Sequence, residues 1–161
     1  MTKNQASAKM FRRVVTAGAH IVQTLVDDYN FRDKLVLIGS TSSDAEPWVA
    51  GLYTQFFDRG IPARIGMLDV LNNGTQAGAY LDVYKHSIVN GYDVLVVDPV
   101  NNRDTQDKHL KKLMAQAQQF RDHGAERLFY VTVEPTHIYP IVLPQKTEAP
   151  KRRSLWTLPF L

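Results

Sequence analysis

Four short apolar runs divide the chain at intervals that are each long enough for one helix. They occupy residues 34–40, 61–70, 92–100 and 127–135. Nearly continuous apolar runs of this length are typical of strands buried on both faces of a parallel sheet. Strands joined by helix-length crossovers pair in parallel, with right-handed connections. The sequence therefore predicts an α/β fold, a three-layer sandwich around a mostly parallel sheet.

The segments around these runs carry apolar residues at three- and four-residue steps, which is the pattern of an amphipathic helix. The expected helices cover residues 6–28, 45–59, 77–90 and 104–123. The positions expected on their apolar faces include Phe11, Val15, Phe57 and Met114. The first helix precedes the first strand, so the predicted fold begins with an N-terminal amphipathic helix.

Length and composition favour one compact domain. The chain has 161 residues, of which 44% are hydrophobic, and it contains no cysteine. This excludes a disulfide framework, a thiolate metal site and a cysteine nucleophile. No apolar run approaches the roughly 20 residues of a membrane-spanning helix, and no export signal is convincing, so we expect a cytoplasmic protein. We assign residues 1–144 to the α/β domain.

Residues 145–161 differ from the domain in composition. They form a basic, proline-containing tail with an apolar end, and the preceding "YPIVLP" is either an edge strand or an extended arm. One interpretation is that the tail folds back over an exposed helix face, and the other is that it docks on a partner protein. The candidate partner-binding residues are Lys151, Arg152, Arg153, Leu155, Trp156, Leu158 and Phe160. The net charge of +3 also allows nucleic acid or a membrane surface as a partner of this tail.

Acidic residues lie at or near the ends of the predicted strands. Because ligands of open parallel sheets bind beyond the carboxyl ends of the strands, these side chains are candidates for a Mg²⁺ site. The alternative is that they cap the following helices, which fits Asp44 and Glu46 well. Asp98 fits capping less well, since Pro99 follows it and the next helix starts later. The full set of candidate ligand-binding residues is Gly39, Ser40, Thr41, Asp44, Glu46, Asp69, Asp98 and Glu134.

"GSTSSDAEPWVAGLYTQFFDRGIPARIGMLDV" and "GYDVLVVDPVNNRDTQDKHLKKLMAQ" resemble the G-domains of signal-recognition-particle-type GTPases and the related partition-type ATPases. The resemblance covers residues 10–134 as a pattern of elements. It implies a P-loop-NTPase-like fold in which Gly39 matches the first glycine of the phosphate loop. It also implies that Asp69 ends the second strand and that Asp98 matches the metal-associated aspartate.

The phosphate loop departs from that family at the residues that bind nucleotide. The pattern G-x-x-x-x-G-K-[ST] supplies a lysine to the phosphates and a hydroxyl to Mg²⁺. Counted from Gly39, those last three positions hold Asp44, Ala45 and Glu46. Two carboxylates would repel a triphosphate, so we expect a degenerate domain without nucleotide hydrolysis. A flavodoxin-like fold is the structural alternative, because a Ser/Thr-rich loop at a helix start also suits a phosphate.

No other catalytic motif stands out. The five histidines lack metal-type spacing, so we expect surface or helix-end positions for them, and no G-x-S-x-G elbow surrounds the serines. The leading hypothesis is a non-catalytic adaptor or assembly subunit that binds protein partners through its surface and tail, without a cofactor. The alternatives are a Mg²⁺-dependent binder or enzyme acting on a nucleotide or other phosphate-bearing ligand, and a nucleic-acid or membrane-surface accessory protein.

Overall fold

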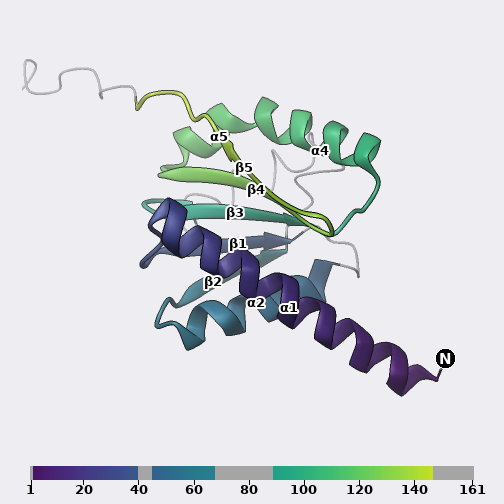
Figure 1. Cartoon of the computed structure of the whole chain (residues 1–161). Coiled ribbons are helices and arrows are strands. Elements are labelled where there is room, and N and C mark those ends of the chain that lie inside the picture. The colour runs from purple at the N-terminus through teal and green to yellow at the C-terminus, as the bar shows by residue number, and fades with distance from the viewer. Residues whose placement is uncertain (1, 40–44, 68–88, 147–161) are drawn as a thin grey trace, which may run out of the picture.

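A five-stranded sheet forms the centre of the computed structural model, which describes residues 2–39, 45–67 and 89–146 (Figure 1). The strand order across the sheet is β2-β1-β3-β4-β5. The first four strands are parallel, and β5 is antiparallel to β4. The strands are β1 Leu35–Gly39, β2 Ala63–Met67, β3 Asp93–Asp98, β4 Arg127–Val133 and β5 Thr136–Ile141. The predicted α/β class with a mostly parallel sheet is confirmed, and "YPIVLP" begins inside an edge strand.

Helices cover both faces of the sheet, which gives the predicted three layers. Helices α1 and α2 pack on one face, and α4 and α5 lie over the other (Figure 1). The helices are α1 Lys3–Tyr29, α2 Ala45–Asp58, α4 Arg103–Ala115 and α5 Ala117–Asp122. The helix expected over 77–90 lies outside the described residues except at its last two positions.

The central strands β1, β3 and β4 are buried along most of their length because both faces of the sheet are covered there. In β1 the alternate residues Leu35 and Leu37 pack with α1 and α2, whereas Val36 and Ile38 pack in the cluster with α4 and α5. All five residues of β1 are buried. This burial explains why β1 shows no polar alternation in the sequence.

The chain reverses its direction of travel across the sheet at β1. It passes from β1 to β2 on one side and then to β3 on the other side of β1. The crevice beyond the carboxyl ends of β1 and β3 is therefore the topological switch point, where open α/β sheets bind ligands. Residues 40–44, which follow β1, lie outside the described part of the chain, whereas the segment after β3 is described.

Helix α1 extends beyond the layer that it helps to form. Its buried residues begin at Val14, and its N-terminal part projects past the sheet (Figure 1). Thr2 and Gln5 form a capping box at its start, and Asn30 ends it in the left-handed conformation. The exposed N-terminal turns are thus stabilised by a local cap more than by core packing.

Four positions expected on buried helix faces are exposed instead. The exposed fractions are 70% for Phe11, 44% for Val15, 61% for Phe57 and 55% for Met114. These predictions were wrong because the apolar stripes are wider than the faces that reach the sheet, so the stripe edges stay outside. The single helix expected over 104–123 is also interrupted, since α4 ends at Ala115 and α5 begins at Ala117.

Two further expectations concern the whole chain. In the described residues, no helix is long and apolar enough to cross a membrane. The tail predicted for 145–161 lies outside the described residues from residue 147 onward.

Candidate functional site

Only part of the predicted acidic edge lies in the described structure. Gly39 is the buried last residue of β1, and Glu46 is exposed in the first turn of α2. Asp98 ends β3, and Glu134 follows β4. The remaining predicted ligand-binding residues, Ser40, Thr41, Asp44 and Asp69, lie outside the described residues, as do the partner-binding residues from Lys151 to Phe160.

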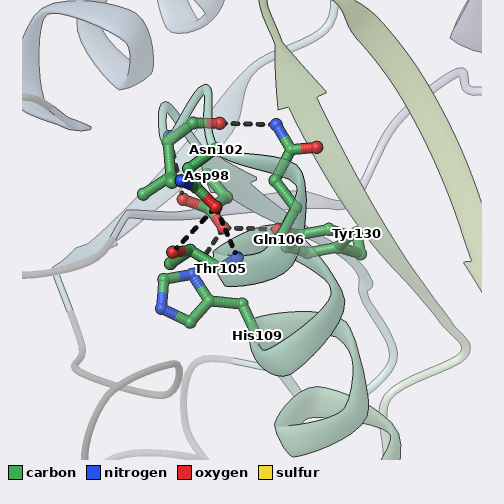
Figure 2. A network of polar contacts seen from close by, with 7 residues as sticks. Asp98, Asn102, Thr105, Gln106, His109 and Tyr130 are labelled. Carbon is green, nitrogen blue, oxygen red and sulfur yellow. Dashed lines mark hydrogen bonds and ion pairs between the residues drawn. The ribbon is translucent and has the colours of Figure 1, made fainter.

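Asp98 is the centre of a buried polar network at the switch point (Figure 2). Its side chain is 1% exposed. Its Oδ1 accepts from the backbone N–H of Val100 at 3.1 Å, and its Oδ2 lies 2.7 Å from Nδ1 of His109. The Tyr130 hydroxyl donates to the same Oδ2. Hydrogen bonds from three directions compensate the cost of burying this carboxylate.

The network joins three elements of the α4 side of the sheet. Asp98 belongs to β3, Tyr130 to β4 and His109 to α4. Burial, and then the hydrogen bond to Asp98, raise the pKa of Tyr130 well above its ordinary value, so the hydroxyl stays protonated and donating. The network therefore fixes α4 against the end of β3 and the middle of β4.

The start of α4 is held by its own hydrogen bonds (Figure 2). Asn102 caps the helix, and its side-chain oxygen accepts from the N–H of Thr105 at 3.1 Å. The Gln106 side chain donates to the carbonyl of Val100 at 2.5 Å. These contacts order the connection that leads from β3 to α4.

A polar pocket of about 280 Å³ lies beside this network. Its wall includes Tyr130 and Gln106 from the network, and also Arg103, His137 and Tyr139. Neither Asp98 nor His109 lines it. The contact between the Asp98 carboxylate and the His109 imidazole resembles that of a general base. Here, however, the pair lies behind the residues that line the pocket, and the imidazole does not face the pocket.

The predicted position of His109 was wrong. The expectation was a surface or helix-end position, but its side chain is 8% exposed. One signal was present: His109 lies in register with the buried helix positions Gln106, Leu113, Ala117 and Phe120, at steps of three and four residues. A histidine on that stripe faces the sheet, where the unexplained Asp98 ends β3.

Glu134 is engaged on the opposite face of the sheet. Both of its carboxylate oxygens accept from Nε of Arg13 in α1, at 3.0 and 3.1 Å, and Nη2 of Arg13 contacts the carboxylate as well. This hydrogen bonding raises the pKa of Arg13 above its ordinary value. Both side chains are more than a third exposed, so the pair contributes little stability, typically about 0–1 kcal/mol.

The described carboxylates do not converge on a metal site. Among the described residues, no group of three or more His, Asp or Glu side chains is placed to hold a metal ion. Asp98 and Glu134 face opposite helix layers, and each binds protein groups. The structure therefore brings Asp98 together with His109 and Tyr130, but not with Glu134.

A second surface has the opposite character. A groove of about 650 Å³ runs between α1 and α2, and most of its lining is apolar. Phe11 and Val15 contribute from α1, and Pro47, Ala50 and Gly51 contribute from α2. We call this surface the α1–α2 groove. Its exposed apolar side chains, on two adjacent helices, mark it as a candidate interaction surface.

Comparison with known protein families finds no family that matches this chain, and comparison with curated proteins finds no match either.

Proposed function

We propose that this protein is a non-catalytic adaptor or assembly subunit that binds a partner protein in its α1–α2 groove. The observation that carries the proposal is the exposure of Phe11 and Val15, at 70% and 44%, beside an apolar groove. Exposed apolar patches with polar surroundings are typical of protein–protein contact sites. The groove is suited to a short apolar segment of a partner protein.

The polar chemistry of the domain supports a non-catalytic role. Asp98, which the sequence analysis matched to a metal-associated aspartate, is bound by His109, Tyr130 and a backbone N–H. The sequence at the start of α2 has Ala45 where a phosphate loop needs lysine, with the acidic residues Asp44 and Glu46 on either side. Both features favour a nucleotide-binding-like shape that no longer performs nucleotide chemistry.

The strand order bears on the ancestry that we propose. The order β2-β1-β3-β4-β5 is that of flavodoxin-like doubly wound sheets, but here β5 is antiparallel to β4. Of the two expected relationships, this order supports the flavodoxin-like alternative more than the P-loop one. An adaptor role is compatible with either, because function depends on the site more than on the fold.

Affinity capture with a matched pair of surface variants tests the proposal. Phe11→Lys places a charge on the α1–α2 groove, and Met114→Lys places one on α4, on the other face of the sheet. Both side chains are mostly exposed, so both variants should fold. Proteins recovered with the wild type should be retained by Met114→Lys and reduced at least ten-fold by Phe11→Lys. Equal recovery by the two variants would show that the groove is not the binding surface.

One observation favours a second candidate function, the binding of a small anionic ligand in the polar pocket. Arg103 and His137 line that pocket at the carboxyl edge of the sheet, together with one carboxylate, that of Asp107. Arg103 is the first residue of α4, where the helix dipole also favours negative charge. A phosphate-bearing ligand is the class that suits this chemistry. Isothermal titration with inorganic phosphate, on the wild type and on Arg103→Gln, tests it: wild-type binding that the variant weakens supports the candidate, and its absence removes it.

A further inference from the structure

The α1–α2 groove has a shape that limits what it can hold. Its walls are two helix stripes with a spacing of three or four residues, Ser7–Phe11–Val15 on α1 and Pro47–Ala50–Thr54–Asp58 on α2. From Pro47 to Asp58 the helix rises about 16 Å. A single extended segment of about six residues matches that length, at roughly 3.3 Å per residue.

We propose that the segment Leu155–Phe160 of the same molecule binds in the α1–α2 groove and covers it until a partner competes. This proposal rests on the groove being the binding surface of the proposed function. Four of the six residues in the segment are large and apolar, Leu155, Trp156, Leu158 and Phe160. Left exposed, a Trp and a Phe beside two leucines would be an aggregation hazard, and so would Phe11.

Charge gives the segment a direction in the groove. Asp58 is the one charged residue among those that line the groove. The basic residues 151–153 precede the apolar segment with only Ser154 between them, so they would lie at the Asp58 end while Phe160 lies toward Pro47. Asp58 ends α2 shortly before β2 begins, which places it at the amino edge of the sheet.

The described part of the chain ends at the same edge. Lys146 pairs with Glu126, which directly precedes β4 and therefore lies at the amino edge too. Nine residues, 147–155, lead from there to Leu155. Fully extended they reach about 30 Å, which is about the diameter of a small domain. Because Glu126 and Asp58 both lie at the amino edge, the connection does not have to run along the length of the sheet.

Disulfide trapping tests the proposal directly, because the chain has no cysteine of its own. In the full chain, Ala50→Cys in the groove is combined with Leu158→Cys in the segment. Ala50 is exposed, so the substitution should not disturb the core. Under mild oxidation we expect a monomeric cross-link, seen as faster migration on a non-reducing gel and as loss of both thiols by mass.

The control pair is Gln118→Cys with Leu158→Cys. Gln118 is exposed on α5, next to Arg121, whose side chain donates to the carbonyl of Pro144 at 2.6 Å. The tail thus starts beside α5, and a randomly moving tail would cross-link there at least as fast as to Ala50. We expect the groove pair to form at least ten-fold faster. Equal rates overturn the proposal, and a cross-linked dimer overturns it in favour of a second copy as the occupant.

Tryptophan fluorescence gives a second readout without cysteines. The chain has two tryptophans, and Trp48 is buried at 2% exposure. The spectrum of the wild type minus that of Trp156→Phe isolates Trp156, and we expect it to be protected from acrylamide. Phe11→Lys should remove that protection and Met114→Lys should keep it; full quenching in the wild type overturns the proposal. Because partner capture is measured separately, a failed cross-link with groove-dependent capture refutes the tail as occupant and leaves the proposed function intact.

Discussion

Asp98 shows how one buried carboxylate determines the local structure around it. Its oxygens contact the backbone N–H of Val100, the imidazole of His109 in α4 and the phenol of Tyr130 in β4. Removing one donor leaves the others in place, but removing the acceptor leaves several buried donors unsatisfied at once. The cost of losing the acceptor is therefore the larger one.

Asp98→Asn tests how much the Asp98 acceptor contributes to the free energy of unfolding. The amide keeps the shape of the side chain but turns one oxygen into a donor that faces another donor. We expect a loss of about 2–4 kcal/mol in the free energy of unfolding, measured by urea denaturation. The control is Asp33→Asn, at an exposed position outside the helices and strands, with an expected change within about 0.5 kcal/mol. Equal effects of the two substitutions would show that the network adds no stability.

The pH dependence of stability tests Tyr130. Its pKa is raised in the folded protein, so the folded state keeps the proton while the unfolded state loses it above about pH 10. The contribution of Tyr130 is thus complete below pH 10 and is lost as the pH rises. Tyr130→Phe should destabilise by about 1–3 kcal/mol at pH 7. The difference in the free energy of unfolding between the wild type and Tyr130→Phe should decrease by about 1.4 kcal/mol per pH unit above pH 10. A difference in unfolding free energy that stays constant up to pH 11 would contradict the raised pKa of Tyr130.

Asp98 was recognisable as a candidate from the sequence, but its partners His109 and Tyr130 were not. Asp98 stood out because it follows an apolar strand and precedes no helix directly. Its contacts with His109 and Tyr130 span 11 and 32 residues and depend on which strands become neighbours. Strand order is a property of the whole sheet, and no local pattern encodes it. The helical register of His109 was the part of the site that the sequence did contain.

Between elements, α1 and α2 approach each other closely at Gly51. A Cβ atom built on Gly51 would lie 2.1 Å from Cγ1 of Val14, far inside the contact distance. Val14 is buried and branched at Cβ, so it has few alternative rotamers. The absence of a side chain at residue 51 is thus what lets the two helices form one wall of the core.

Gly51→Ala tests this packing. In a free helix the change would stabilise by up to about 1 kcal/mol, but here overpacking should outweigh it, with a net loss of about 1–2 kcal/mol. The measurement is the urea midpoint at constant slope. Combining Gly51→Ala with Val14→Ala removes the clash, so the double variant should be more stable than the sum of the two single effects. Additive effects would mean that the two residues do not clash.

Helices and strands were predictable from the sequence where the apolar run or apolar stripe is long and clear. Each predicted strand that lies in the described residues is a strand. The runs at β1, β3 and β4 are the clearest, because burial on both faces makes them almost uniformly apolar. The break between α4 and α5 at Gln116 was not predictable, since the buried stripe continues across it and neither Gly nor Pro marks it. The exposure of Phe57 and Met114 was also hidden, because a stripe does not reveal how much of it the sheet covers.

For the whole molecule, the sharpest alternative is a metal- and nucleotide-binding domain. A ligand at 100 times its dissociation constant stabilises the protein by roughly 2.7 kcal/mol. We expect Mg²⁺ with ATP or GTP at millimolar concentration to leave the melting temperature unchanged. A clear upward shift that requires both the metal and the nucleotide would contradict the non-catalytic proposal.

The fold class followed from the spacing of strands and helices, but the function of the protein did not. An acid after each strand suggested a shared metal site, and that expectation assumed that neighbouring strand ends point the same way. In the described structure Asp98 faces α4 and Glu134 contacts α1. Two carboxylates on opposite faces of one sheet cannot share an ion, however similar their positions in the sequence.

The antiparallel strand β5 also decides how this sheet can grow. The N–H of His137 points toward β4, since it donates to the Thr132 hydroxyl. Backbone donors alternate sides along a strand, so the nitrogen of Pro140, three residues on, faces away from β4. A proline nitrogen carries no hydrogen, and this edge therefore lacks a donor that an incoming strand would need. Any extension of the described sheet by a strand from another chain is thereby disfavoured at β5 and directed toward the β2 edge.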